Sequence, residues 1–253
     1  MMGLVETQAI VLQTYKLADA DKIVLCMTEN AGLVRGVARG ARRLKSRFGA
    51  SLEPFTLIHL TFFEKETREL VTIKSAEIVR SYFDAARDAY KVAALERLVE
   101  LVREFAPPHQ ADERLFRMLR ACIEALAGGV DPAAVYTYCE LWVLKLTGFL
   151  PDMKACGGCG RRLREPSARE LYLTQEGVVW CPACRSGGAR TLERDTYELL
   201  YAARGLKPGD WALEYSRHTL DARQSASEIA RALVRRALEA EPRAGRFSKS
   251  LSV

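Results

Sequence analysis

The chain has 253 residues, and 38 Lys and Arg against 32 Asp and Glu give it a net charge of +6. Hydrophobic residues make up 49% and charged residues 28%, a globular composition that excludes a largely disordered or fibrous chain. No stretch approaches the roughly 18 uninterrupted apolar residues of a membrane span, and the N-terminus lacks the basic-then-apolar pattern of a signal peptide. We therefore expect a cytoplasmic protein without membrane contact.

The first 80 residues alternate between apolar and polar side chains, with turn residues between the runs, as is typical of β-strands. Five short strands are predicted, over residues 7–15, 22–28, 33–37, 55–63 and 70–79. Five strands in so short a segment fit a small closed barrel, which leaves no open sheet edge. An OB-type barrel is one member of this set, and a different five-stranded barrel would give the same pattern.

After Arg80 the apolar period changes from 2 to 3.6, which predicts helices over residues 83–105, 112–127, 131–148, 191–204 and 225–238. The third begins at Asp131-Pro132, an N-cap followed by proline, and the last at a capping box, Ser225-Ala-Ser-Glu228. The expected fold is α+β. Four segments are predicted: a barrel (1–80), a helical domain (81–151 plus 191–241), a cysteine module (152–190) and a flexible basic tail (242–253).

The seven cysteines are not expected to form the disulfides of a secreted protein, because an odd count without a signal peptide argues against a disulfide framework. Cys26, Cys122 and Cys139 lie singly inside apolar patterns, as buried core thiols do. The other four form two tight pairs, Cys156 with Cys159 and Cys181 with Cys184.

The two pairs are separated by 21 residues. Each Cys-x-x-Cys turn points two thiolates at one ion, so together they supply the four sulfurs of a structural Zn²⁺ site. Thioredoxin-like redox chemistry is the alternative, but it needs a single pair at a helix start after a strand. The three histidines lie outside the HExxH and HxE patterns of catalytic zinc. We therefore expect the zinc to hold a small module together.

No acidic residue occurs from Asn30 to Leu52, and a basic loop on a small barrel can follow a phosphate backbone. The candidate DNA contacts in this stretch are Arg35, Arg39, Arg42, Arg43, Lys45 and Arg47. Phe48 and Phe55 are either stacking faces for bases or core residues. Charge runs are often only solvated faces, but further basic residues occur in the cysteine module and the tail: Arg161, Arg162, Arg164, Arg169, Arg185, Arg190, Arg243, Arg246 and Lys249.

Catalytic motifs are missing from the sequence, including a GxSxG elbow, a kinase set, a P-loop and a Rossmann glycine fingerprint. The glycines at positions 32, 36 and 40 are not followed by Gly-Lys-Ser or Gly-Lys-Thr. We therefore expect a protein that is not an enzyme.

Three pairs of short segments occur in a recognisable order. TQAIVL (7–12) precedes ADADKIV (18–24), GARRLKSRF (40–48) precedes LEPF (52–55), and GFLP (148–151) precedes the first cysteine pair. In this order the chain resembles, over nearly its whole length, the bacterial RecO recombination-mediator family. Leu44 stands where many members of that family have proline.

The resemblance implies an N-terminal OB-fold, a central helical bundle and an inserted zinc-finger module. It implies binding of single- and double-stranded DNA, annealing of complementary strands, and help in loading RecA onto strands coated by single-stranded-DNA-binding protein (SSB). RecR and the acidic C-terminal tail of SSB are the implied partners, at the nucleoid in the cytoplasm. By matched position, the implied DNA contacts are Arg39, Arg42, Arg43, Lys45 and Arg47.

Two other classes of protein stay open. A zinc-ribbon regulator without annealing activity would place a recognition helix in a DNA groove; the best candidate, residues 227–241, has Arg231, Arg235 and Arg236 but no Asn or Gln. An enzyme would need an apolar pocket with convergent titratable groups on the helical domain.

Overall fold

The computed structural model describes residues 3–64, 70–82, 88–106, 110–163, 170–185 and 187–240. The chain forms two compact units, with the boundary between Gly129 and Val130. In the described ranges, the first holds the barrel and two α-helices, and the second holds four α-helices and the cysteine module. The division into four segments expected from the sequence stays a prediction. Within the described ranges, no helix is long and apolar enough to cross a membrane.

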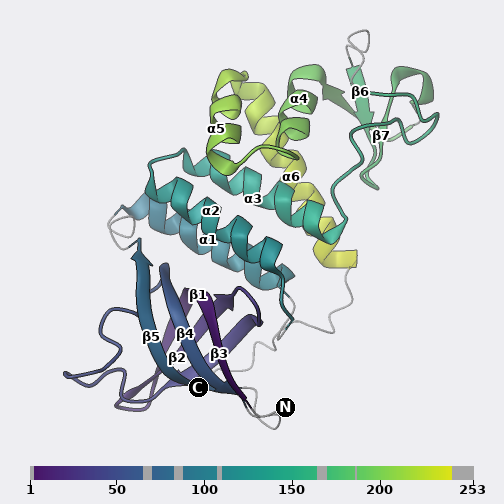
Figure 1. The fold of residues 1–253 in the computed structure, drawn as a ribbon. Coiled ribbons are helices and arrows are strands. Elements are labelled where there is room, and N and C mark those ends of the chain that lie inside the picture. Colours follow the sequence, from purple (N-terminus) through teal and green to yellow (C-terminus); the bar gives the residue numbers. More distant parts are fainter. Residues whose placement is uncertain are drawn as a thin grey trace. The chain divides into compact units, whose positions relative to one another are not determined.

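The first unit begins with a closed five-stranded barrel (Figure 1). Its strands are β1 (Gly3–Leu17), β2 (Asp21–Thr28), β3 (Gly32–Ala38), β4 (Thr56–Glu64) and β5 (Val71–Ser81). Around the barrel they follow the order β1-β2-β3-β5-β4, with β4 returning to β1. Only β3 and β5 run parallel among these pairs. This is the OB-type arrangement, and with the helices and the cysteine module it confirms the predicted α+β fold.

The long first strand closes the barrel, because it pairs with two neighbours. Its first half, Gly3 to Ile10, is antiparallel to β4, and its second half, Ala9 to Leu17, is antiparallel to β2. A register shift between Val11 and Gln13 marks a β-bulge, which bends the strand from one partner to the other. On β3, a Cβ at Gly36 would lie 2.7 Å from the Ile73 side chain on β5, so glycine permits this close pairing.

Two helices complete the first unit: α1 (Ala89–Phe105) and α2 (Glu113–Ala127). Asp88 and Asp112 cap their N-termini by accepting hydrogen bonds from backbone N–H groups. Arg103 on α1 donates to the Gln13 side chain on β1 at 2.8 Å, which ties the helix to the barrel. The first residues of the predicted helix (83–87) and Pro107-Pro108 lie outside the described residues.

Helix α3 (Pro132–Thr147) lies among the helices of the second unit (Figure 1). Asp131 caps it and Gly148 ends it at a φ of +82°, as the sequence predicts. Its Tyr138, Trp142 and Lys145 side chains each donate a hydrogen bond to a carbonyl between residues 203 and 206. The helices around it are α4 (Arg194–Ala202), α5 (Pro208–Arg217) and α6 (Leu220–Ala240).

Two predictions in the second unit are wrong at helix starts. The predicted helix over 191–204 begins as strand β8 (Arg190–Glu193), because these residues pair with β6 of the cysteine module. The last helix begins at Leu220, and the predicted capping box lies inside it. Thr219 precedes the helix and its hydroxyl accepts from the Ala222 N–H, while the Ser227 hydroxyl donates to the Arg223 carbonyl one turn back. Helix α5 was not predicted.

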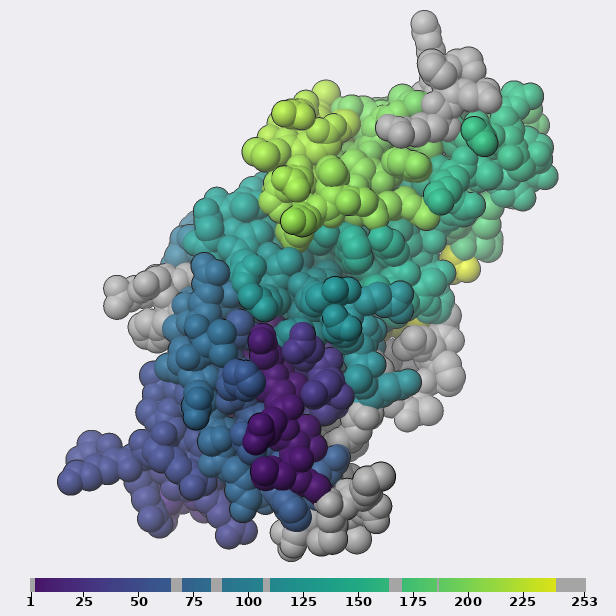
Figure 2. Space-filling view, in the orientation of Figure 1, coloured from purple at the N-terminus to yellow at the C-terminus, as the bar shows by residue number. Residues whose placement is uncertain are grey.

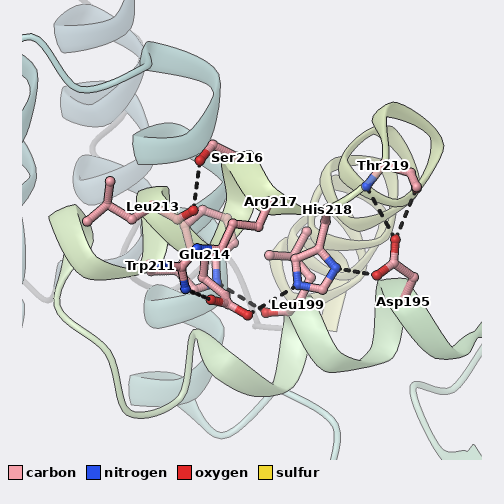
Figure 3. Close-up of polar contacts among 9 residues, drawn as sticks. All are labelled: Asp195, Leu199, Trp211, Leu213, Glu214, Ser216, Arg217, His218 and Thr219. Atoms are coloured by element: carbon pink, nitrogen blue, oxygen red, sulfur yellow. Dashed lines mark hydrogen bonds and ion pairs between the residues drawn. The ribbon is translucent and has the colours of Figure 1, made fainter.

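The junction between α5 and α6 is fixed by a polar cluster around His218 (Figure 3). Asp195 on α4 accepts hydrogen bonds from His218 Nδ1 and from the Thr219 N–H and hydroxyl. The other ring nitrogen of His218 lies 3.5 Å from Glu214 on α5. Burial opposes the charge of Asp195, but the hydrogen bonds from His218 and Thr219 outweigh it and lower the pKa of the carboxyl. The Asp195 carboxylate of α4 therefore binds the two residues that connect α5 to α6.

Candidate nucleic-acid interface and metal centre

The candidate DNA contacts lie mainly on one projection of the barrel, which we define as the basic loop (residues 39–47). It follows β3 and stands out from the barrel surface as the blue-violet projection in Figure 2. Five of the six cations are exposed on it: Arg39, Arg42, Arg43, Lys45 and Arg47. Arg35 lies instead on β3 itself and is half-buried. The structure therefore separates Arg35 from the other five.

Hydrogen bonds hold the base of the loop against the β1–β2 turn and the first residue of β2. The Gly40 N–H donates to the Asp21 carboxylate at 2.8 Å, and the Arg42 N–H donates to the Ala20 carbonyl at 2.9 Å. The Arg42 guanidinium also donates to the Ala18 carbonyl at 2.8 Å. These contacts fix the direction of the loop backbone and the position of the Arg42 guanidinium.

The segment after the loop anchors it in the barrel core. Phe48 is 4% exposed and Leu52 is 1% exposed, and both belong to the cluster of apolar side chains inside the barrel. Phe55 is also buried. Phe48 and Phe55 are therefore core residues, and neither ring is available for stacking on a base. The Arg47 guanidinium lies over the Phe48 ring, 4.9 Å from its centroid.

The electrostatics of the loop are unbalanced. Among the residues that the structure describes, no carboxylate forms an ion pair with any of the five loop cations. The nearest acidic residue in the chain after the loop, Glu53, pairs with Lys22 at 3.2 Å. The loop therefore presents uncompensated positive charge, which attracts a polyanion.

The four paired cysteines converge on one point. Their Sγ atoms all lie within 4.8 Å of one another, and those of Cys159 and Cys181 are 3.7 Å apart. Zn–S bonds of ~2.3 Å in a tetrahedron place sulfur atoms about 3.8 Å apart, close to the separation of the Cys159 and Cys181 sulfurs. The cluster can hold a metal ion, and its identity as zinc stays a prediction.

Backbone donors around Cys156 favour its thiolate form. The N–H groups of Gly158 and Cys181 approach its sulfur at 3.4 and 3.3 Å. Burial opposes the charge, but backbone hydrogen bonds, those from Cys181 and Cys159 foremost, lower the pKa of Cys156 to about 6. Hydrogen bonds to the Cys159 and Cys181 sulfurs raise the pKa of Cys184 to about 12. The cluster thus resists a second negative charge, and a bound divalent cation would remove this resistance.

The turn of the first pair requires its two glycines. A Cβ at Gly157 would lie 2.2 Å from the Val178 side chain, and one at Gly158 would lie 3.0 Å from the Cβ and Sγ of Cys184. Glycine at position 158 therefore allows the close approach of Cys184 in the second turn, and glycine at position 157 leaves room for the Val178 side chain.

A small sheet supports the cluster, in the order β7-β6-β8. It consists of β6 (Glu170–Leu173), β7 (Val179–Trp180) and β8, and a short 3-10 helix, η2 (Pro182–Cys184), carries the last cysteine. Tyr197 on α4 donates its hydroxyl to the Met153 carbonyl at 2.6 Å, which ties the module to the helices.

The basic residues of the cysteine module are only partly described. Arg161, Arg162, Arg185 and Arg190 are exposed. Arg164, Arg169 and the tail residues Arg243, Arg246 and Lys249 lie outside the described residues.

An OB-fold barrel with an exposed basic loop, joined to a four-cysteine module, defines a class of nucleic-acid-binding protein. Residues 1–82 match the family model described as Recombination protein O N terminal, and residues 86–246 match Recombination protein O C terminal. The chain belongs to the RecO family of DNA repair proteins.

Curated relatives named DNA repair protein RecO support this assignment. The one from Anaeromyxobacter sp. (strain K) is 34% identical over 192 residues, which cover 76% of this chain and 74% of the relative. The one from Anaeromyxobacter dehalogenans (strain 2CP-1) is 35% identical over 184 residues, which cover 72% of this chain and 71% of the relative. The one from Nocardioides sp. is 35% identical over 212 residues, which cover 81% of this chain and 83% of the relative.

Proposed function

We propose that this protein binds single- and double-stranded DNA through the basic loop and anneals complementary strands without a catalytic step. In recombinational repair it helps load RecA onto single strands coated by SSB. The membership in the RecO family supports this proposal. The observation that carries it is the loop itself, whose five exposed cations lack carboxylate partners among the described residues and stand on an anchored backbone.

The proposed mechanism is electrostatic. Two complementary strands repel each other through their phosphates, and cations placed between them lower this repulsion. Binding releases condensed counterions, so log K falls against log salt with a slope of about −0.7 per phosphate contact on single strands. Arg39, Arg42, Arg43, Lys45 and Arg47 are the proposed contacts, with Arg35 beneath them on β3.

The proposed partners are RecR and the C-terminal tail of SSB. A contact with that tail brings the protein to coated strands and raises its effective concentration there. Deleting the SSB tail should then slow the annealing of SSB-coated strands, because the protein is no longer recruited to them. In the second unit Cys156, Cys159, Cys181 and Cys184 would hold Zn²⁺, which supplies structural stability to the module and takes no part in annealing.

The test is annealing of complementary oligonucleotides without ATP across a salt series. The loop variant changes Arg42, Arg43, Lys45 and Arg47 to Ala. A charge-matched control changes four exposed cations of the cysteine module to Ala: Arg161, Arg162, Arg185 and Arg190. We expect fast, salt-sensitive annealing by the wild-type protein and the control, and its loss in the loop variant with circular dichroism unchanged.

Two other outcomes would change the conclusion. Loss of annealing in the control alone would move the site from the loop to the cysteine module. Absence of annealing by the wild-type protein at every salt concentration would contradict the proposal and favour the DNA-binding regulator. That regulator would instead show sequence-dependent affinity for duplex DNA.

A further inference from the structure

Leu44 is the most exposed large apolar side chain among the described residues, at 102% of its reference exposure. A single exposed leucine is ordinary on a protein surface, so its setting decides whether it matters. Other exposed apolar side chains, such as Leu4 at 59% and Leu213 at 64%, lie on a strand and a helix that carry no comparable run of cations. Leu44 lies at the tip of the basic loop.

The backbone at this tip is a closed turn. The Ser46 N–H donates to the Arg43 carbonyl at 2.9 Å, so Leu44 and Lys45 are the two central residues of the turn. A second hydrogen bond, from the Arg43 N–H to the Gly40 carbonyl at 3.1 Å, closes the preceding turn. The Phe48 N–H donates to the Ser46 hydroxyl at 3.3 Å and leads into the barrel core. The leucine is therefore held outward by an ordered backbone.

The charged residues on both sides of Leu44 are cations that can bind phosphate. Arg43 and Lys45 flank it directly, and Arg42 and Arg47 lie on either side of these two, all exposed. A strand whose phosphates contact these cations brings its bases against the only apolar side chain at the tip. Phe48, the nearest aromatic residue along the chain, is buried and cannot stack on a base.

We propose that Leu44 is an apolar wedge that inserts between adjacent bases of a single DNA strand whose phosphates the flanking cations hold. Proteins that bind the minor groove of duplex DNA insert apolar side chains such as leucine between stacked bases, and we extend this contact to a single strand held by cations. The contact is independent of sequence, because every base has an apolar face. Bases held apart present their pairing edges to a complementary strand. The inference rests on DNA binding by the basic loop and adds to it a contact with the bases.

The experiment uses full-length protein and a single-stranded oligonucleotide that contains 2-aminopurine, whose emission rises when it is unstacked. Emission is read at saturating protein, and fluorescence anisotropy gives the affinity and its salt dependence separately. The variants are Leu44→Ser, Leu44→Met and the matched control Leu213→Ser, which changes an exposed leucine of the second unit. Because no charge changes, the salt slope should stay the same in all three.

We expect the wild-type protein to raise the emission, and Leu44→Ser to reduce this rise by roughly half or more. Leu44→Met keeps apolar bulk and should preserve the rise, as should Leu213→Ser. An equal rise in Leu44→Ser and wild type would overturn the wedge and leave DNA binding intact. A rise only in duplex DNA would also overturn it. Absence of salt-dependent binding by the wild-type protein would refute both the wedge and the proposed function.

Discussion

The basic loop and the four-cysteine cluster arrange their functional groups in opposite ways. In the loop the charged side chains diverge into solvent, while backbone hydrogen bonds and the buried Phe48 hold the segment in place. In the cluster the sulfur atoms of four side chains converge to within 4.8 Å of one another, and a Cβ at Gly157 would require the Val178 side chain to move. A divergent surface should lose its function gradually as charges are removed, whereas a convergent site should lose it with one ligand. Three predictions test this contrast and one tests the His218 cluster, from the largest expected effect to the smallest.

Replacing one ligand should have the largest effect. We expect Cys181→Ser to abolish metal binding, so that zinc measured by mass spectrometry falls from about one ion per chain to near zero. Structural zinc stabilises small modules by roughly 10–16 kcal/mol, so the cysteine module should then be cleaved rapidly by protease. Cys26→Ala is the matched control, because Cys26 is buried in the barrel and should leave the zinc content unchanged. Full zinc occupancy in Cys181→Ser would show that the cluster is not the metal site.

Removing the anchor of the loop should come next. Phe48→Ala leaves a cavity in the barrel core, which should lower the free energy of unfolding of the first unit by about 3–5 kcal/mol. Leu44→Ala, in the same loop but exposed, should change it by less than about 0.5 kcal/mol. Both are measured by denaturant unfolding. Equal stabilities would mean that the loop is held by its hydrogen bonds alone, without the core.

The cluster around His218 offers a smaller effect with a pH signature. Asp195→Asn should lower the free energy of unfolding of the second unit by about 1 kcal/mol at neutral pH, discounted because the carboxylate is partly exposed. The pKa of Asp195 is lowered in the folded state. The carboxylate therefore contributes to the free energy of unfolding above the pKa of an unfolded Asp, about 3.9. This contribution disappears as the pH falls through the lower folded value. The two proteins should therefore converge in stability in acid, and a constant difference would contradict this assignment.

Single loop charges should have the smallest effect. Arg43→Ala should reduce the salt slope of single-strand binding by about 0.7 and leave stability within about 0.5 kcal/mol of wild type. Arg42→Ala should reduce the slope equally, but should also lower the free energy of unfolding by about 0.5 kcal/mol because its guanidinium donates to the Ala18 carbonyl in an exposed hydrogen bond. Anisotropy titrations and denaturant unfolding measure the two effects. Loss of all binding in Arg43→Ala would show that the loop is a convergent site after all.

Local signals predicted much of the fold. Alternating apolar residues gave five strands, and the cap at Asp131 and the left-handed Gly148 gave both ends of α3. The prediction failed where a distant partner overrode the local pattern. Residues 190–193 form a strand because β6 offers an edge, and α6 begins at Leu220 because Asp195 holds His218 and Thr219 at its start. Neither partner is visible in a short window of sequence.

The site was predictable in its residue types and not in its details. The spacing of the cysteines predicts a cluster because two short turns can place four sulfurs around one ion. The acid-free run from Asn30 to Leu52 predicts a basic surface. That Arg35 lies on a strand, that Phe48 is buried and that Leu44 is exposed depend on how the loop folds back on the β1–β2 turn. The family resemblance marked Leu44 only as a departure from proline, and no pattern of residue types in the loop predicted its exposure.

By itself the sequence determined the chemistry this protein can offer: four thiolates in pairs, a run of cations and the apolar periods of a barrel and its helices. These depend on residue identity and on contacts a few positions apart. The tertiary structure decided which side chains diverge and which converge, because burial and hydrogen bonding join residues that are far apart in the chain. The loop cations face solvent because Phe48 and Leu52 fill the barrel beneath them. The first cysteine turn approaches Cys184 of the second turn closely because Gly158 carries no side chain.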